Sequence, residues 1–400
     1  MEAHNLPEAL SLIMEQRGCS GSQLARDLGV SQSWLSDAAR GKKDTPTAKA
    51  IRLLASVGWE LVIRPKSPKR EEGDSVKRRE FVTAAASVMF VPSPKIGPYE
   101  DPANVRALAR RVADARFEHG GGAVASTAIR HIRRIESAVT SRNRELQEAA
   151  SSLAEQTTWT LNDACRINAG ENAGRLALKL AKASGNPRAQ SRAYDALISL
   201  NLDHGAPDRA LIYANKGVQL QEIPDLPQAW MKLKKGWALA HIPGQKNRAR
   251  DEVETVQGLL QDTHGFYSQS SSENYGDGRP HAGVVADMIG NIGLSLSDLG
   301  IYEEAQAAFN DCVRGLEDSS PALAAFFVAH QVQTALKASH VPLAADRMLR
   351  LAHIAPLVNS PRVDGCLSEV LKQSVIWVKE PRIRDARDQL KAVASPNTRT

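Results

Sequence analysis

The sequence predicts an all-α protein in two parts, a small N-terminal helical domain and a longer array of helical hairpins. Three observations predict this class. Residues 20–41 are typical of two short helices joined by a tight glycine turn. From about 105 to 378 the chain is rich in Ala and Leu at helical spacing. Strand-like runs are few, and turn signals recur roughly every fifteen to twenty residues.

The N-terminal domain is centred on residues 20–41. Apolar residues fall where two packed helices bury their side chains, namely Leu24, Leu28, Val30, Leu35 and Ala38. Ala25 lies where the helices cross, and Gly29 supplies the positive φ that the turn needs. Ser20 and Ser31 are each placed to cap the helix that follows. An ordinary helical hairpin with these residues in convenient places is the alternative.

Together with the basic turn ARGKKDTP at 39–46, the segment from about Leu6 to Arg64 resembles the Xre family of helix-turn-helix domains, the phage-repressor and Cro type. The resemblance implies that the second helix reads base edges in the major groove through Gln32, Ser33, Trp34, Ser36 and Asp37. It implies backbone phosphate contacts from Ser22, Arg40, Lys42, Lys43 and Lys49.

Two residues depart from the family pattern, Gly21 at the start of the first motif helix and Trp34 in the reading helix. Gly21 stands where many members place a Gln that touches DNA, so one contact is absent. Trp34 is large for this helix, and packing against the edge of its own domain is the alternative to a DNA contact. The segment up to Arg64 is nearly balanced in charge, so a head that binds protein in place of DNA is a further alternative.

The first domain is expected to span 1–64 and a linker with a connecting helix 65–104. GWELVIRP at 58–65 alternates apolar and polar residues, which predicts one short strand. Residues 77–92, KRREFVTAAASVMFVP, are interpreted as an amphipathic or buried helix. They follow a whole domain, so they are not an export signal, and the apolar run is shorter than the roughly 20 residues of a membrane span.

Tandem helical hairpins are expected over 105–385, followed by a flexible tail at 386–400. The strongest repeat places small, turn, small, large and small residues at tetratricopeptide positions, namely Gly293, Gly300, Ala305, Phe309 and Cys312. A second copy aligns Gly205, Ala210 and Ala214 with Gly300, Ala305 and Phe309. Weaker copies lie at 168–181, around Gly244 with Ala249, and around Ala345, Leu349 and Ala352. An irregular helical bundle is the alternative to this superhelix.

As a whole, the head, the RREF connector, the GGGA entry at 120–123 and the repeats resemble the actinobacterial family of Xre and tetratricopeptide transcriptional regulators. In architecture they are similar to the peptide-sensing regulators of Gram-positive quorum systems. The resemblance implies a cytoplasmic, nucleoid-associated homodimer on a palindromic operator, whose repeats bind a signalling peptide or a partner protein. The alternative function is an interaction scaffold that uses the head for docking.

A peptide in the repeats would be held by polar side chains on the inner helices. The candidates are Asn162, Asn168, Arg192, Asp195, Asn201, Asp287 and Asn291. For each Asn, a helix cap or a solvated position is the alternative. The polar stretch 263–281 is expected to be a flexible loop, and the basic face at 130–136 a solvated surface.

Composition excludes several classes of function. The net charge is +6 over 400 residues, from 51 Lys and Arg against 45 Asp and Glu, which permits nucleic-acid binding without requiring it. The four cysteines lie far apart with no CxxC pair, so buried reduced thiols and no metal site are expected. The chain has no P-loop, no HExxH and no nucleophile elbow, so neither an enzyme nor a cofactor is expected.

Overall fold

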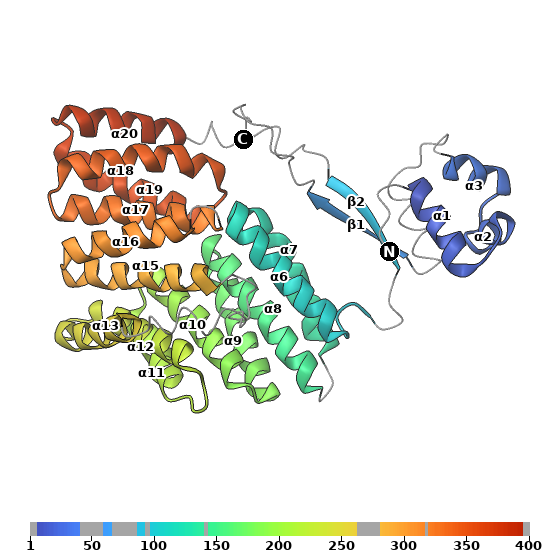
Figure 1. The fold of residues 1–400 in the computed structure, drawn as a ribbon, viewed down its shortest axis with the longest axis horizontal. Helices are drawn as coiled ribbons and strands as arrows, with labels where there is room; N and C mark the ends of the chain where they lie inside the picture. Colours follow the sequence, from blue (N-terminus) through green and yellow to red (C-terminus); the bar gives the residue numbers. More distant parts are fainter. Residues whose placement is uncertain are drawn as a thin grey trace. The chain divides into compact units, whose positions relative to one another are not determined.

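The structure is a computed structural model that describes residues 6–40, 59–65, 86–92, 97–139, 143–261, 281–316 and 319–394. The chain divides into two compact units, Met1–Pro98 and Tyr99–Arg399, called here the N-terminal unit and the hairpin unit. Regular structure in the described residues is helical apart from one two-stranded sheet (Figure 1). The predicted all-α class is confirmed at this level.

The described part of the N-terminal unit contains the helices α1 (Leu6–Arg17), α2 (Gly21–Asp27) and α3 (Gln32–Ala39). Ser20 and Gln23 form a reciprocal capping box at α2, and the Ser31 hydroxyl accepts from the backbone N–H of Trp34 at 3.2 Å. Gly29 has φ +64°, as predicted for the turn. The helices share one apolar core, made of Ala9, Leu10, Ile13, Leu24, Ala25, Leu28, Leu35 and Ala38.

A two-stranded antiparallel sheet follows in the chain. Strand β1 (Trp59–Pro65) pairs with β2 (Ala86–Pro92) in a register that sets Trp59 opposite Pro92. The predicted strand is confirmed. The connecting helix expected over 77–92 is wrong for 86–92, because Val88, Phe90 and Val91 favour extended backbone and β1 supplies a pairing partner. The remainder of that segment lies outside the described residues.

The hairpin unit consists of antiparallel helix pairs that follow one another along the chain (Figure 1). The pairs are α6 (Pro102–His119) with α7 (Gly121–Ala138), α8 (Arg144–Asp163) with α9 (Ile167–Ser184), α10 (Pro187–Asp203) with α11 (Pro207–Val218), α12 (Asp225–Ala240) with α13 (Lys246–Gln261), α15 (His281–Leu299) with α16 (Tyr302–Leu316), α17 (Pro321–Lys337) with α18 (Val341–Ile354), and α19 (Pro361–Gln373) with α20 (Pro381–Ala394). Short 3-10 turns, Ala355–Leu357 and Ser374–Trp377, precede α19 and α20.

The hairpins share one turn geometry. Apart from Gly120 in the first pair, a residue with positive φ lies between the two helices of five pairs, at Cys165, Gly205, Gly244, Gly300 and Ser339. At Gly300 the amide donates to the Ser297 carbonyl, and the next amide donates to the Leu296 carbonyl. The same two bonds recur at Cys165, Gly205 and Ser339. This shared turn supports a repeated unit over an irregular bundle.

Small residues in the second helix let the two helices of each hairpin approach closely. Five residues after each of these turn positions a small residue is buried, at Gly170, Ala210, Ala249, Ala305 and Ala344. Nine residues after it the buried residues are Gly174, Ala214, Val253, Phe309 and Met348. The predicted register Ala345, Leu349 and Ala352 is therefore one residue late. Leu349 is 38% exposed, because the turn position is Ser339 and the buried position nine residues later is Met348.

Helix α8 is buried on nearly all sides although its sequence is polar. Its Thr157, Thr158 and Thr160 hydroxyls donate to backbone carbonyls four residues earlier, at 2.8 to 2.9 Å. The Ser151 hydroxyl donates to the Ala177 carbonyl of α9 at 2.9 Å. These bonds satisfy the hydroxyls inside the protein, so α8 can lie at the centre of the unit.

The hairpins curve far enough for the first to meet the last. Helix α6 contacts α17, and α8 contacts α19. The last helix is no tail: α20 runs to Ala394, and its Ile383, Ala386 and Leu390 are fully buried in the main core. The expectation of a flexible tail from 386 is wrong up to 394, because an apolar stripe on α20 covers the end of the stack. The predicted loop at 263–281 lies outside the described residues apart from His281, which starts α15.

Candidate functional site

Helix α3 presents the residues expected to read DNA. Gln32 and Ser33 are exposed in its first turn, whereas Ser36 and Asp37 are half-buried. Trp34 is half-buried against the core of its own unit, which favours the packing alternative. An exposed Gln at the start of a capped helix can offer its amide to a base edge.

The residues expected to hold phosphates are described in part. Ser22 and Arg40 are exposed, and the Arg40 guanidinium donates to both the carbonyl and the hydroxyl of Ser36. Arg40 therefore sits at the end of α3 beside one of the proposed base-reading residues. Lys42, Lys43 and Lys49 lie outside the described residues.

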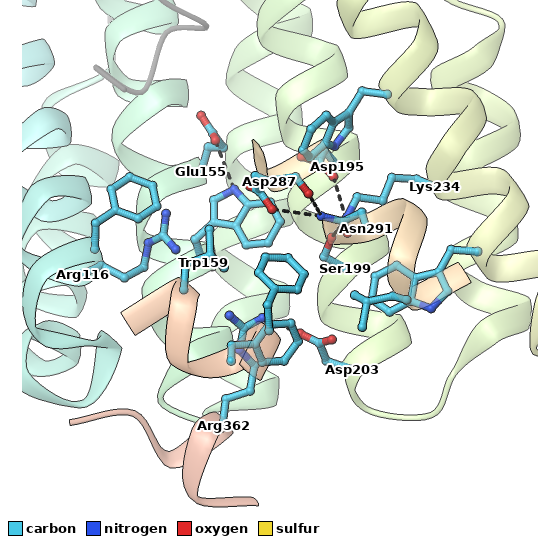
Figure 2. A pocket seen from close by; sticks show the side chains of 17 residues that line it. Arg116, Glu155, Trp159, Asp195, Ser199, Asp203, Lys234, Asp287, Asn291 and Arg362 are labelled. Atoms are coloured by element: carbon cyan, nitrogen blue, oxygen red, sulfur yellow. Dashed lines mark hydrogen bonds and ion pairs between the residues drawn. The ribbon is translucent and has the colours of Figure 1, made fainter. Parts of the chain in front are cut away.

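A polar pocket lies at the centre of the hairpin unit, between the first helices of the hairpins, called here the inner helices (Figure 2). It is lined by Arg116, Phe117, Glu155, Trp159, Asp195, Ser199, Asp203, Trp230, Lys234, Trp237, Asp287, Asn291, Leu294, Leu323, Phe326, Phe327 and Arg362. The space amounts to about 590 Å³ including its opening to solvent, but only about 40 Å³ admits the centre of a water molecule. The space has room for a few water molecules and for no larger molecule.

Lys234 is the central cation of this pocket and is only 2% exposed. Its ammonium donates to the Ser199 hydroxyl and the Asn291 carbonyl oxygen, each at 2.8 Å, and lies 3.5 Å from an Asp195 carboxylate oxygen. It also faces the rings of three tryptophans at 5.0 to 6.0 Å, namely Trp159, Trp230 and Trp237. A buried charge is tolerated only with such partners.

Four carboxylates line the pocket; Glu155, Asp195 and Asp287 lie in the upper part of Figure 2, and Asp203 lies in its lower part near Arg362. Glu155 accepts from the Trp159 indole at 3.2 Å and pairs with Arg192 at 3.4 Å. Asp287 accepts from the Asn291 amide at 2.9 Å. Aromatic faces therefore lie next to groups of both charge signs, which suits a small ligand with charged ends and an apolar body.

The structure sorts the residues predicted to hold a ligand into three groups. Asp195, Asp287 and Asn291 line the pocket, and Arg192 reaches its wall through Glu155. Asn162 donates to Asp203 at 2.6 Å behind the lining. The last group, Asn168 and Asn201, does not line the pocket. The Asn201 amide donates to the Leu197 carbonyl of its own helix at 2.7 Å, and Asn168 is exposed at the start of α9.

Sequence reasoning missed the cation and the aromatic side chains of the pocket. Trp230, Lys234 and Trp237 follow one another at helical spacing on α12. Trp159 repeats this face on α8, and Arg362 completes it from α19. The signal available in the sequence was a lysine within an apolar helical stripe. Because a lysine is rarely buried without a partner, its place in such a stripe indicates a buried site with polar or charged partners.

The loop before α19 closes the ring of inner helices against the turn after α6. The Asn359 amide donates to the His119 carbonyl at 2.7 Å, and the Gly122 amide donates to the Asn359 carbonyl at 3.0 Å. A Cβ on Gly122 would lie 2.4 Å from the Asn359 side-chain oxygen, so only glycine fits without displacement. This seam, residues 119–122 against 359–362, shuts the concave face expected of an open superhelix.

Arg362 ties the seam to the pocket. It pairs with Asp203 at 3.0 Å and with Asp163 at 3.4 Å, and its guanidinium lies 4.0 Å from the centre of the Phe326 ring. Burial alone would lower the pKa of Arg362, but the charges of both aspartates and the hydrogen bond to Asp203 outweigh it and raise that pKa. Arg362 and Asp203 also line the pocket, so one ion-pair cluster belongs to both features.

Acid should weaken the hairpin unit through His330. This ring packs edge-on against Phe326, and burial lowers its pKa from 6.5 to about 4. Between these values the unfolded chain binds more protons than the folded chain, so stability falls as pH drops from about 6.5 to about 4. We expect a loss of roughly 2 to 3 kcal/mol, allowing for the part of His330 still in contact with solvent.

The acid effect is measured by denaturant unfolding across this pH range, with His330→Gln as the matched variant. The free energy of unfolding of that variant should change less with pH than that of the wild type. Equal pH dependence in both proteins would contradict the assignment to His330.

The four cysteines are free thiols, but their environments differ from expectation. Cys312 is buried, whereas Cys165 is exposed, because it occupies a hairpin turn and not a helix interface. Burial raises the pKa of Cys366 to about 12, so that thiol stays protonated. The described residues contain no group of three or more potential metal ligands among His, Cys, Asp and Glu. No described helix is both long and apolar enough to span a membrane.

No model of a known protein family matches this chain, and no curated protein matches it either.

Proposed function

We propose that this chain is a sequence-specific DNA-binding transcription regulator whose hairpin unit responds to a small ligand in the central pocket. The observation that carries the DNA-binding part is the exposed start of α3. Gln32 and Ser33 project from a helix that is capped by Ser31 and packed against α2 through Leu35 and Ala38. A rigid helix with polar residues in its first turn suits insertion into the major groove.

The ligand part is supported by the pocket's chemistry. Lys234, Asp195 and Asn291 offer fixed polar groups beside three indole rings, and such a wall can hold the charged termini and one apolar side chain of a short peptide. Because the described space admits only a few waters, a ligand must separate the inner helices as it enters. It can alter DNA binding only by favouring the separated arrangement over the closed one.

Two copies on a palindromic operator complete the proposal, since a symmetric operator needs two reading heads. A second candidate function, a protein-interaction scaffold, is favoured by one observation. The turn before α20 exposes apolar side chains, with Ile376 77%, Val375 53% and Val378 44% exposed. A scaffold that binds partner proteins at this turn would show no sequence preference for DNA.

Gln32→Ala is expected to weaken binding to the preferred operator by about 1 to 3 kcal/mol while leaving other sequences little changed, because only the specific base contact is lost. Arg40→Ala should weaken all sequences about equally, because a phosphate contact carries no sequence information. Selection of bound fragments from genomic DNA, followed by titrations across salt, measures both effects. Equal losses for both variants on every sequence would remove the base-reading role of Gln32.

Asn291 and Asn201 form a matched pair for the ligand proposal. Asn291→Ala should abolish the response to a pocket ligand, because its side chain lies in the lining and holds Lys234. Asn201→Ala should leave the response intact, because its amide bonds only its own helix. Small molecules that co-purify with the protein are identified by mass spectrometry and titrated by calorimetry. Equal responses in the two variants would exclude this pocket.

A further inference from the structure

An exposed basic face lies on the first hairpin of the hairpin unit, and the proposed function does not use it. Arg130, Arg133 and Arg134 are exposed on α7, and Arg110 and Arg111 are exposed on α6. Residues 102–138 contain seven Arg and no Lys against three Asp and Glu, a net charge of +4. The net charge of the whole chain is +6, so the net charge of this hairpin equals two thirds of it.

The arginines of α7 are not neutralised inside the protein. Among the described residues, neither Arg130, Arg133 nor Arg134 forms an ion pair. Arg130 donates to the Thr127 hydroxyl at 2.8 Å, and Arg134 lies 5.8 Å from the centre of the Tyr99 ring. These contacts orient the side chains and leave their charge uncompensated.

Arginines elsewhere in the unit do find carboxylates. Arg106 pairs with Glu145 at 2.9 Å, and Arg382 pairs with Asp346 at 3.3 Å, both at exposed positions. Exposed arginines of this unit can therefore pair with carboxylates, but among the described residues those of α7 do not.

The spacing on α7 costs stability unless an anion is present. Arg130 is three residues from Arg133 and four from Arg134, so their charges repel along one side of the helix. His131 lies among them, and its Nδ1 is 2.7 Å from the Tyr99 hydroxyl. Burial, followed by the charges of Arg130, Arg134 and Arg111, lowers the pKa of His131. The arginine charges thus add to burial in disfavouring a charge on His131.

We propose that this face, centred on Arg130, Arg133 and Arg134, binds backbone phosphates of DNA. The inference rests on the proposed DNA-binding function and adds a second contact surface to it. Guanidinium groups match phosphate oxygens in planar, paired geometry, and phosphodiester charge relieves the repulsion along α7. Such a contact adds salt-dependent affinity without sequence preference.

The test compares two charge-matched double variants of the full chain. Arg130→Gln with Arg134→Gln removes two positive charges from the face. Arg382→Gln with Arg384→Gln removes two exposed positive charges at the start of α20. Each protein is titrated across salt with a duplex selected for binding and with a non-selected duplex of equal length. Thermal unfolding checks that both variants fold like the wild type.

The face variant should bind both duplexes roughly 10- to 50-fold more weakly at 0.15 M salt, and its slope of log affinity against log salt should fall by about 2. The α20 variant should match the wild type. Equal DNA affinity and salt dependence in the two variants would overturn the inference. That result is expected if the face binds an acidic protein partner and not DNA.

Failure of the proposed function has a different signature. In that case the wild type would not distinguish the two duplexes, and Gln32→Ala would change nothing. Loss of the remaining DNA binding in the face variant alone would still support the phosphate contact. If the wild type prefers the selected duplex and the face variant retains full affinity, only the inference about this face is wrong.

Discussion

Gly121→Ala is expected to destabilise the hairpin unit by about 2 to 4 kcal/mol. A Cβ at Gly121 would lie 2.3 Å from the Thr160 carbonyl oxygen and 2.7 Å from the Asp163 Cβ. The first contact is with backbone of α8, which cannot swing aside as a flexible side chain does. The Gly121 amide also donates to the Asp163 carboxylate, and the displacement would break this bond. The contact of the first hairpin with α8 should loosen, and with it the seam, because Asp163 also accepts from the Ser360 hydroxyl and pairs with Arg362.

Gly365→Ala is the matched control for this prediction. Gly365 lies in α19, on the other side of the seam, and a Cβ there would meet nothing within 4 Å. Since alanine is the better helix former, this variant should gain roughly 0.5 to 1 kcal/mol. Denaturant unfolding of both variants measures the difference. A Gly121→Ala protein as stable as the wild type would show that the seam tolerates the extra methyl group and is not tightly built.

Arg362→Met is expected to destabilise the unit by about 3 to 5 kcal/mol. The Asp163 and Asp203 side chains are only 6% and 10% exposed, so without the guanidinium two carboxylates would face each other in a poorly hydrated place. The Arg362 contact with the Phe326 ring is lost as well. Calorimetric or denaturant unfolding would measure the loss.

Two comparisons separate this buried cluster from an ordinary ion pair. Adding Asp203→Asn to Arg362→Met should recover part of the loss, because it removes one of the uncompensated charges. Arg382→Met breaks the exposed pair with Asp346, in which both side chains are more than half exposed, and should cost at most about 1 kcal/mol. Equal costs for Arg362→Met and Arg382→Met would contradict a structural role for the cluster.

The losses of unfolding free energy caused by Gly121→Ala and Arg362→Met should not be additive. Gly121 and Arg362 meet at the same carboxylate, since Asp163 accepts from the Gly121 amide and pairs with Arg362. Once one substitution has opened the seam, the second has less left to disrupt, so the double variant should cost less than the sum. Because Arg362 and Asp203 also line the pocket, opening the seam should make the indoles of Trp159 and Trp237 more accessible to a fluorescence quencher.

The sequence predicts local features well because they depend on neighbouring residues. Ser20 and Ser31 cap their helices, Gly29 adopts positive φ, and Gly205 and Gly300 occupy equivalent turns, as predicted. In each case the deciding interaction lies within a few residues of the chain. The helix expected at 86–92 failed for the opposite reason, since pairing with β1, more than twenty residues earlier, favours a strand there.

The candidate site divides in the same way. Gln32 and Ser33 could be assigned from a motif, because their exposure follows from their place in one short helix. Asp195, Asp287 and Asn291 could be assigned from repeat register. The sequence could not show that Asn201 differs from these three residues. Its side-chain amide donates to a carbonyl of its own helix, and repeat register does not indicate which hydrogen bond a side chain forms.

Residue spacing and backbone conformation are sufficient to predict the all-α class, the capped helices and glycine turn of the head, and the positions at which hairpins bury small residues. The three-dimensional structure was needed to show that the hairpins close on themselves, that Lys234 lies among three tryptophans, and that Arg362 joins the seam to the pocket. Such contacts join residues up to about 200 positions apart, and their geometry depends on the summed curvature of every hairpin between them.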